Sequence, residues 1–245
     1  MMFNLSGHSI LVTGASSGIG KGTCSALSDQ GATIILSGRN EEKLRETKTD
    51  LKNNDHEIIS ADLKDIQDIK ALAKNVQTLD GIVFNAGWVK TRPLRFMNDD
   101  DLENTFEVNI LSSIRLLREL LKKKKLNSGA SVCFVSSIAS FKPTRGNAMY
   151  AASKGAVNSF CKATALELAP KGIRVNAVLT GMIETSILDN SSISEDQLNE
   201  HKKNYPLGRF GSVKDVASLL VYLMASESSW MTGSLIKLDG GFTLK

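Results

Sequence analysis

Short apolar runs alternate with longer amphipathic segments along the whole chain. Runs of this kind are typical of strands buried on both faces, and the segments between them are long enough for helices. Because parallel strands need crossover connections, the alternation predicts a doubly wound α/β fold, with a parallel sheet of about seven strands and helices on both faces. The predicted strands are Ser9–Thr13, Thr33–Ser37, Glu57–Ala61, Gly81–Asn85, Ala130–Ser136, Arg174–Leu179 and Leu235–Leu238.

The pattern gives no reason to divide the chain. It contains no repeat, low-complexity tract or proline-rich linker, so residues 1–245 are predicted to form a single domain. The segment from Ile183 to Tyr205 interrupts the alternation with serine, asparagine and acidic residues. Long excursions in compact domains are often functional, and this segment is therefore predicted to be a lid.

Composition narrows the class of protein. With 42% hydrophobic and 23% charged residues, the chain is typical of globular proteins and not of disordered or fibrous ones. No run approaches the roughly 18 apolar residues of a membrane helix, and the first residues lack the leader of a signal peptide. The net charge of +4 is too small to indicate nucleic-acid binding. We expect a cytoplasmic protein that binds neither membranes nor nucleic acid.

Cysteine and histidine residues indicate neither a disulfide framework nor a metal site. Cys24, Cys133 and Cys161 are widely spaced, odd in number and form no CxxC pair, so we interpret them as small core residues in a reducing compartment. The three histidines are isolated and match no HExxH pattern. No metal is predicted.

A glycine-rich segment, TGASSGIG, joins the first predicted strand to an apparent helix from Lys21. Gly14 would allow a tight turn, and Gly18 would let backbone approach phosphates at a helix N-terminus. Gly20 would allow close helix packing, which completes a Rossmann site for a pyrophosphate. The spacing departs from GxGxxG, and a purely structural turn is the alternative. The predicted cofactor residues in this segment are Gly14, Ser16, Ser17, Gly18, Ile19 and Gly20.

The same segment resembles the TGxxxGIG signature of the short-chain dehydrogenases/reductases, and the likeness covers essentially the whole chain. The resemblance implies that Asp62, with Leu63 beside it, contacts adenine and that Thr185 holds the nicotinamide carboxamide. It also implies that the Asn85-Ala86-Gly87 turn flanks the cofactor. The further matches, in the family's order, are Asp62, Asn85, Ala86, Gly87, Asn109, Ser137, Tyr150, Lys154 and Thr185.

The end of the second predicted strand bears on the choice between NAD and NADP. An acidic residue there would bind the ribose 2′-hydroxyl and repel a 2′-phosphate. This strand instead runs into Arg39, whose planar guanidinium suits a phosphate. The sequence therefore predicts NADP (NADPH). The alternative is that Arg39 is a solvated loop cation, and Glu41 and Glu42 could weaken the positive potential.

Tyr150 and Lys154 are four residues apart on a predicted helix and so project from one face. Free tyrosine has a pKa near 10, and a nearby ammonium would lower it and make Tyr150 a usable acid and base. Ser137 ends the fifth predicted strand, where parallel sheets place ligands. It lies thirteen residues before Tyr150, as the family's serine does, with Ser136 as the runner-up.

The resemblance implies further catalytic roles. Lys154 would contact the nicotinamide ribose, and Asn109 would help to hold a water that relays protons to Lys154. An ordinary helix residue is the alternative for Asn109. The predicted catalytic residues are Asn109, Ser137, Tyr150 and Lys154.

Two positions depart from what the resemblance leads us to expect. Family members usually carry Pro-Gly after the sixth strand, whereas this chain has Thr180-Gly181. The turn could be looser for lack of proline's fixed φ, or it could gain a hydroxyl contact. Trp88 is bulkier than expected after Gly87 and could belong to the core, the cofactor wall or the substrate mouth.

Within the family, the likeness is closest to the 3-oxoacyl-carrier-protein reductases, on the stretches Gly181–Thr185, Pro206–Gly211 and Thr232–Gly241. We therefore predict an NADP-dependent reductase of 3-oxoacyl thioesters, with a reductase or dehydrogenase of another small ketone, sugar or alcohol as the alternative. A non-catalytic NADP-binding regulatory protein is a third hypothesis. The resemblance also implies a homotetramer.

A basic run, Lys122–Lys125, is the strongest local charge feature. An acyl carrier protein is acidic, and a reductase that serves one needs a cationic surface near its active site. Both this run and Lys171 precede a predicted strand, which indicates the amino edge of the sheet, away from the cofactor. Docking of an acyl-carrier-linked substrate on this run is one hypothesis, and a solvated helix end is the other.

Overall fold

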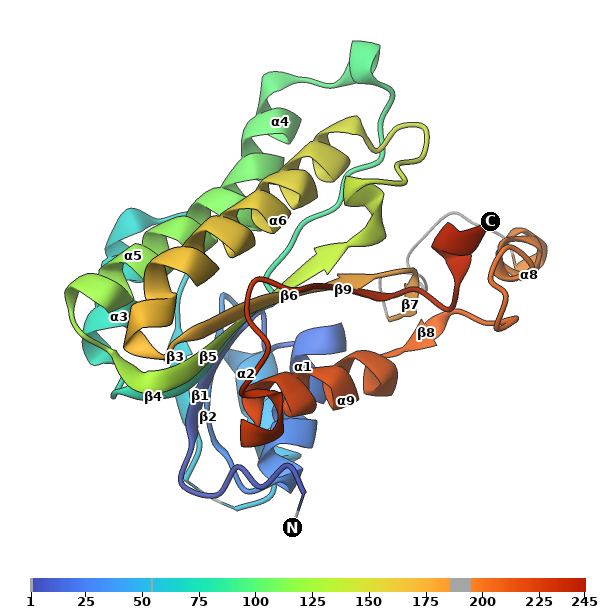
Figure 1. Ribbon diagram of the computed structural model, residues 1–245. Helices are drawn as coiled ribbons and strands as arrows, with labels where there is room; N and C mark the ends of the chain where they lie inside the picture. The colour runs from blue at the N-terminus through green and yellow to red at the C-terminus, as the bar shows by residue number, and fades with distance from the viewer. Residues whose placement is uncertain (1, 54, 186–194) are drawn as a thin grey trace.

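Seven parallel strands form the central sheet of the computed structural model, which describes residues 2–53, 55–185 and 195–245 (Figure 1). Their order is β3-β2-β1-β4-β5-β6-β9, and every neighbouring pair is parallel. The predicted fold class is confirmed. The strands are β1 (Ser9–Thr13), β2 (Thr33–Gly38), β3 (Glu57–Ser60), β4 (Leu79–Phe84), β5 (Leu126–Ser137), β6 (Arg174–Thr180) and β9 (Leu235–Leu238).

Helices cover both faces of the sheet (Figure 1). One face packs against apolar residues of α3, α5 and α6, and the other against α1, α2 and α9. The helices are α1 (Gly18–Asp29), α2 (Glu41–Thr49), α3 (Ile66–Asn75), α4 (Asp99–Phe106), α5 (Ser112–Lys122), α6 (Ala148–Leu168), α8 (Glu195–Lys202) and α9 (Val213–Met224). The short turns are η1 (Leu94–Phe96), η2 (Glu107–Leu111), η3 (Ile138–Ser140), η4 (Ala169–Lys171), η5 (Ser226–Ser228) and η6 (Phe242–Leu244).

Alternation along the strands builds these two cores. In β1, Leu11 packs into the α3, α5 and α6 layer, while Ile10 and Val12 pack into the opposite layer. Successive side chains of a strand point to opposite faces, so a strand that is apolar throughout serves both layers. The three cysteines are unpaired and buried in these cores, as predicted.

The order of the strands creates a crevice at one edge of the sheet. After β1 the chain builds outward through β2 and β3, and then returns to place β4 on the other side of β1. The connections after β1 and β4 therefore diverge, and they leave an opening at the carboxyl ends of these two strands. This is the point at which doubly wound sheets bind their ligands.

Several boundaries differ from the sequence-based predictions. Strand β5 begins at Leu126 and not at Ala130, because Leu126 pairs with Leu79 across a register shift. A second, two-stranded parallel sheet of β7 (Ile183–Glu184) and β8 (Gly211–Ser212) lacks the apolar pattern that would have predicted it. Of the predicted lid, residues 186–194 lie outside the described residues, so the lid stays a prediction.

The basic run lies at the amino edge of the sheet, as predicted. Lys122 ends α5 and pairs with Glu119 at 3.4 Å, while the Lys125 side chain donates to the Val76 carbonyl at 2.6 Å. The Lys125 carbonyl accepts from Leu79 N at the start of β4. Among the described residues, no helix is long and apolar enough to cross a membrane.

Candidate active site

A cavity of about 610 Å³ opens at the carboxyl ends of β1, β2, β4, β5 and β6. It brings together predicted site residues that are up to 171 positions apart, from Gly14 to Thr185. Of the predicted site residues, Gly20 and Asn109 are not in the part of its wall that the structure describes. The predicted residues that line it are Gly14, Ser16, Ser17, Gly18, Ile19, Arg39, Asp62, Leu63, Asn85, Ala86, Gly87, Ser137, Tyr150, Lys154 and Thr185.

The glycine-rich segment forms the floor of this cavity. Helix α1 begins at Gly18, three residues before the predicted Lys21, so the last glycines belong to its first turn. Gly14 has a φ of +65°, in the left-handed region that favours glycine. A Cβ on Gly20 would lie 2.1 Å from the Gly14 carbonyl oxygen, so a side chain there has no room. The turn and the helix are thus packed against each other.

The N-terminus of α1 fits a phosphate group. Its N-cap residue, Ser17, makes no side-chain capping bond, and the first turn holds no acidic residue. The first N–H groups of the helix therefore lack the side-chain acceptors that would compete with an anion. Ser16, Ser17 and Gly18 all line the cavity, which is the arrangement that binds a pyrophosphate at a helix N-terminus.

Asn85 joins the end of β4 to the glycine-rich turn. Its side-chain amide donates to the carbonyls of Thr13 and Gly14, at 3.3 and 3.2 Å. In return, the Thr13 hydroxyl accepts from the backbone N–H groups of Asn85 and Ala86, at 3.1 and 3.2 Å. These four bonds fix the crevice between β1 and β4.

Arg39 projects from the end of β2 into the cavity wall. Its guanidinium makes no ion pair with any described residue, whereas the neighbouring Glu41 is paired with Arg45 at 2.6 Å. Of the two neighbouring carboxylates, that of Glu41 is therefore occupied elsewhere. On the next connection, Asp62 turns its Oδ1 to the backbone N–H of Lys64 at 3.0 Å.

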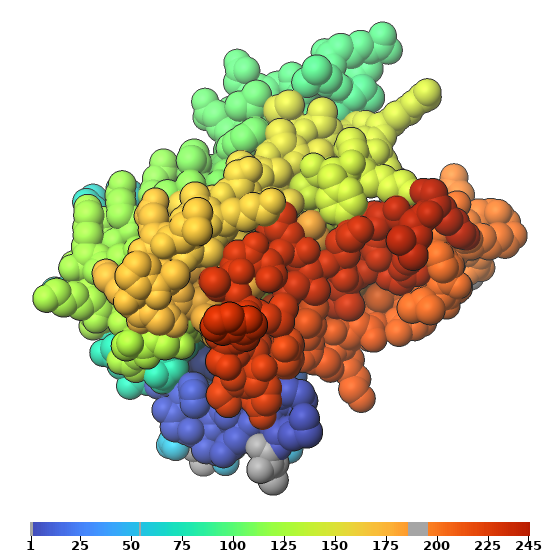
Figure 2. Space-filling model, viewed as in Figure 1, coloured from blue at the N-terminus to red at the C-terminus, as the bar shows by residue number. Residues whose placement is uncertain are grey.

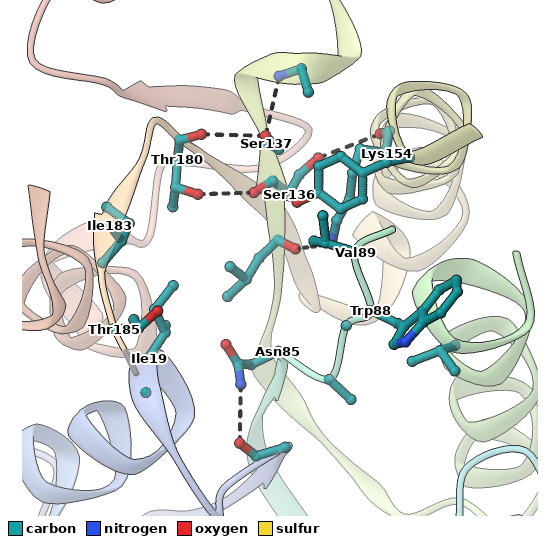
Figure 3. Close-up of a pocket in the computed structure, with 18 of the residues that line it drawn as sticks. Ile19, Asn85, Trp88, Val89, Ser136, Ser137, Lys154, Thr180, Ile183 and Thr185 are labelled. Atoms are coloured by element: carbon teal, nitrogen blue, oxygen red, sulfur yellow. Dashed lines mark hydrogen bonds between the residues drawn. The ribbon is translucent and has the colours of Figure 1, made fainter. Parts of the chain in front are cut away.

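Ser137, Tyr150 and Lys154 all line the cavity where β5 and α6 meet it, and Figure 3 shows Ser137 and Lys154 there. Burial raises the pKa of the Tyr150 phenol, and hydrogen bonding with Ser137 partly offsets this effect. Burial also lowers the pKa of Lys154 to about 8. The Lys154 ammonium donates to the Val135 carbonyl at 2.9 Å and lies 5.8 Å from the centroid of the Tyr150 ring.

This arrangement corrects one step of the sequence-based reasoning. The spacing of the two residues predicts that the Lys154 ammonium lowers the pKa of Tyr150, but in the folded chain burial dominates and the pKa of Tyr150 is raised. The physical reason is that Tyr150 is itself buried, which disfavours its charged form, while the Lys154 ammonium gives its hydrogen bond to Val135. Tyr150 is therefore protonated at neutral pH, the state in which it has a proton to donate.

Asn109 lies outside the described cavity wall and contacts Trp88. It belongs to η2, a single turn of π-helix, which shifts its side chain toward the loop after β4. Its Oδ1 accepts from Trp88 N at 2.7 Å, and its Nδ2 donates to the Trp88 carbonyl at 2.9 Å. The same Nδ2 lies 3.0 Å from the hydroxyl of Ser153, which donates to the Tyr150 carbonyl at 2.8 Å. Trp88 lines the cavity, so it is a wall residue.

Of the two alternatives for the Thr180-Gly181 turn, the structure shows the one in which the Thr180 hydroxyl makes a contact. Its Oγ1 donates to the Ser136 carbonyl at 3.3 Å, and its carbonyl accepts from Ser137 Oγ at 3.5 Å (Figure 3). Ser136 itself donates to Asn158 at 2.7 Å. Thr180 thus binds both residues at the end of β5, and both of these serines line the cavity.

The sequence reasoning missed the far side of the cavity. This wall contains Lys142, Asn147, His201, Tyr205 and Phe242, which come from the loop after β5, the end of α8 and the C-terminal segment. Tyr205 packs on Phe242 with ring centroids 4.9 Å apart, and its hydroxyl accepts from Met182 N at 3.1 Å. No local motif marks these residues, because they meet only in three dimensions.

The family model described as enoyl-(acyl carrier protein) reductase matches residues 14–243. The 3-oxoacyl-acyl-carrier-protein reductase of Rickettsia bellii is 32% identical over 243 residues, which cover 99% of this chain and all of that protein. The chain belongs to the short-chain dehydrogenase/reductase family. It is therefore an oxidoreductase of the dehydrogenase/reductase type, and this family uses nicotinamide cofactors.

Other members of the short-chain dehydrogenase/reductase family are similarly close. Glucose 1-dehydrogenase of Gluconobacter oxydans is 34% identical over 97% of this chain and 92% of that protein. A short-chain dehydrogenase/reductase of Brucella melitensis, described as glucose/ribitol dehydrogenase, superposes with a TM-score of 0.92 at 30% identity over 99% of both chains. The relatives thus carry different substrate names, and membership of the family leaves the substrate open.

Proposed function

We propose that this short-chain dehydrogenase/reductase is an NADPH-dependent reductase that converts a ketone into a secondary alcohol, with 3-oxoacyl thioesters as its substrates. The observation that carries the proposal is the convergence of Ser137, Tyr150 and Lys154 on the cavity that also receives the N-terminus of α1. A cofactor phosphate and a reacting carbonyl can be held in one cavity only because these elements end at the same edge of the sheet.

The proposed cofactor residues fit NADPH. The uncapped start of α1 would bind the pyrophosphate, and Asp62 with Leu63 would flank the adenine. Arg39 would bind the 2′-phosphate, since its guanidinium has no carboxylate partner among the described residues and a charge-assisted bond to phosphate is roughly twice as strong as a neutral one. Asn85, Ala86, Gly87 and Thr185 would flank the nicotinamide half.

The proposed chemistry divides between the cofactor and the protein. Bound NADPH would supply a hydride to the carbonyl carbon. Tyr150 donates its phenolic proton to the carbonyl oxygen as that oxygen gains negative charge, and Ser137 hydrogen-bonds the same oxygen. Lys154, charged below a pH of about 8, stabilises the negative charge that the departing proton leaves on Tyr150. Asn109 positions Trp88 against this site.

Thioester substrates are favoured by the relatives with the same full-length coverage. The reductases of 3-oxoacyl-carrier-protein match from end to end, and the sequence stretches around Gly181 and Pro206 resemble that subgroup. Glucose 1-dehydrogenase is equally similar, which makes a sugar or polyol the second candidate. A homotetramer and a cytoplasmic location accompany the proposal as predictions from the resemblance and from the free cysteines.

A substrate panel tests the proposal. The purified protein is mixed with NADPH and acetoacetyl-pantetheine, and separately with NADP⁺ and glucose, while the absorbance of the reduced nicotinamide is followed. The proposal predicts rapid loss of NADPH with the thioester and little reaction with glucose. The reverse result would assign the sugar dehydrogenase reaction, and no turnover with any ketone or alcohol would favour a non-catalytic NADP-binding protein.

A further inference from the structure

Lys142 is the charged side chain at the substrate end of the cavity. The charged residues in the described wall are Arg39, Asp62, Lys64, Lys142 and Lys154. The first three follow β2 and β3, at one edge of the sheet, and Lys154 belongs to the catalytic cluster. Lys142 instead follows η3 and faces Phe242, which follows β9 at the opposite edge. The two ends of the cavity therefore carry separate positive charges.

No side-chain carboxylate of the described residues neutralises the Lys142 ammonium, although it is partly buried. The ammonium donates to the Phe242 carbonyl at 3.0 Å and to a main-chain oxygen of Lys245, and it lies 4.8 Å from the centroid of the Phe242 ring. The nearby carboxylate of Asp239 is used by the backbone N–H groups of Gly241 and Thr243, each at 3.0 Å.

The Lys142 ammonium has the properties of a binding position for an anion. An ammonium has three donors, and two of those on Lys142 bond main-chain oxygens, so one remains for a ligand. A partly buried charge without a side-chain counter-ion is costly, and an anionic ligand reduces that cost. The charge-assisted bond that it forms is stronger than a bond between neutral groups.

Of the two hydrogen bonds of the Lys142 ammonium, the one to Lys245 is the one that a substrate anion can replace. Lys245 is exposed, whereas Phe242 is packed against Tyr205. An incoming anion can therefore take the remaining donor of the ammonium and also replace the Lys245 oxygen.

The surroundings of Lys142 hold it in place. The C-terminal segment, dark red in Figure 2, lies alongside the yellow-green segment that follows β5. Lys142 N donates to the Ile138 carbonyl at 2.9 Å, which anchors the backbone of this loop to η3 directly after Ser137. The ammonium is thus held on a short, structured connection from the predicted catalytic serine, inside the same cavity.

We infer that Lys142 binds an anionic group of the substrate, a carboxylate or a phosphate, and thereby selects ketone substrates that carry one. The inference rests on the proposed carbonyl reduction, since the anion is a group of the ketone that this reaction would reduce. The negative charge has two sources: a carboxylate at the far end of an oxoacyl chain, or the phosphate of a pantetheine arm. Both would satisfy the same ammonium.

Binding of unreactive probes tests the inference without any turnover. In the presence of NADP⁺, calorimetry compares 4′-phosphopantetheine with pantetheine, and monomethyl glutarate with dimethyl glutarate. We expect one anionic probe to bind wild type roughly tenfold or more tightly than its neutral partner, and Lys142→Met to remove that difference. Lys142→Arg should keep most of it. The pair that shows the difference identifies phosphate or carboxylate as the source.

Two further variants serve as controls. Lys237→Met should retain the preference for the anionic probe. The Lys237 ammonium lies 5.5 Å from the centroid of the Phe141 ring, and Phe141 precedes Lys142 in the sequence, but Lys237 is not part of the described cavity wall. A chain that lacks Lys245 should bind the anionic probe at least as tightly as wild type, since a competing oxygen is gone.

Three results would overturn the inference. The first is equal binding of both members of each pair to wild type. The second is an equal loss of affinity for both members of a pair in Lys142→Met, since that pattern means that the lysine only holds the C-terminal segment. The third is loss of the preference when Lys245 alone is removed.

The failure of the proposed function would look different. If wild type binds one anionic probe preferentially but reduces no ketone with NADPH, the anion site stands and the proposed reaction falls. If wild type reduces acetoacetyl-pantetheine and acetoacetyl-4′-phosphopantetheine with the same KM, and no probe pair differs in affinity, the reaction stands and the inference about Lys142 falls.

Discussion

Asn109 holds both backbone polar groups of Trp88: its Oδ1 accepts from Trp88 N at 2.7 Å, and its Nδ2 donates to the Trp88 carbonyl at 2.9 Å. A side-chain amide that pairs in this way imitates a neighbouring strand. It fixes the loop after β4 at the point where the cavity wall begins. The role that the resemblance implies for Asn109, at a proton relay, is therefore joined by a structural one.

Replacing Asn109 by Ala should release Trp88 and lower turnover by roughly 10²-fold, because small displacements of a positioned wall are costly in rate. Asn109 is buried and its bonds to Trp88 are partly buried, so the variant should also unfold at a lower temperature. Steady-state kinetics and thermal unfolding check both effects. Asn104→Ala, which removes an amide that bonds Lys64 at the surface, is the control and should change neither much. Equal effects of the two changes would contradict this account of Asn109.

Arg39→Asp should reverse the cofactor preference. The substitution removes the unpaired guanidinium and supplies a carboxylate that repels a 2′-phosphate and accepts from a ribose hydroxyl. We expect wild type to bind NADPH more tightly than NADH and the variant to prefer NADH. Titration of both cofactors into each protein, followed by fluorescence, measures the change. Equal dissociation constants for NADPH and NADH in wild type would show that Arg39 is a solvated cation.

The buried Lys154 gives stability a particular dependence on pH. Its folded-state pKa of about 8 lies below its ordinary value of 10.5, so the unfolded chain binds more protons between these two values. The free energy of unfolding therefore rises with pH across this window through Lys154, and the charge destabilises the fold below it. The total effect is on the order of 3 kcal/mol.

Lys154→Met isolates that effect. The difference in unfolding free energy between the variant and wild type should favour the variant most at pH 7, and should shrink as the pH rises from about 8 to 10. Denaturant unfolding at a series of pH values measures it. A difference that stays constant over this range would mean that Lys154 is not destabilised by its burial.

Gly20→Ala should prevent proper folding of the cofactor turn, since the new Cβ would lie 2.1 Å from the Gly14 carbonyl oxygen. We expect a loss of stability of several kcal/mol and of cofactor binding. Gly155→Ala in α6 is the matched control, because a Cβ there would meet no described atom within 4 Å apart from its chain neighbours and the adjacent helix backbone. There, alanine should stabilise the helix by about 0.5–1 kcal/mol. If the packing argument holds, thermal unfolding shows a lower midpoint temperature than wild type for Gly20→Ala and a higher one for Gly155→Ala.

Much of the fold could be predicted from local pattern. The apolar runs located all seven strands of the main sheet, because strands buried on both faces must be apolar throughout. The ends were less predictable: β5 starts at Leu126 because it pairs with Leu79, a contact between distant segments. Strands β7 and β8 have two residues each, which is too short for any periodicity.

The same distinction applies to the candidate site. Residues in contiguous motifs, such as Gly14 and Tyr150, could be named from the sequence, and the structure brings them to one cavity. His201 and Phe242 could not, because nothing nearby in sequence indicates that they share a wall. The raised pKa of Tyr150 was also beyond the sequence, since it depends on burial and not on the spacing to Lys154.

The central claim is that Tyr150 gives its proton to a carbonyl that NADPH reduces. The most direct measurement compares wild type and Tyr150→Phe for NADPH oxidation with acetoacetyl-pantetheine and for NADPH affinity. Because only the proton-donating hydroxyl is lost, turnover should fall by at least about 10² while the dissociation constant for NADPH stays nearly unchanged. Near wild-type turnover in Tyr150→Phe would contradict the account.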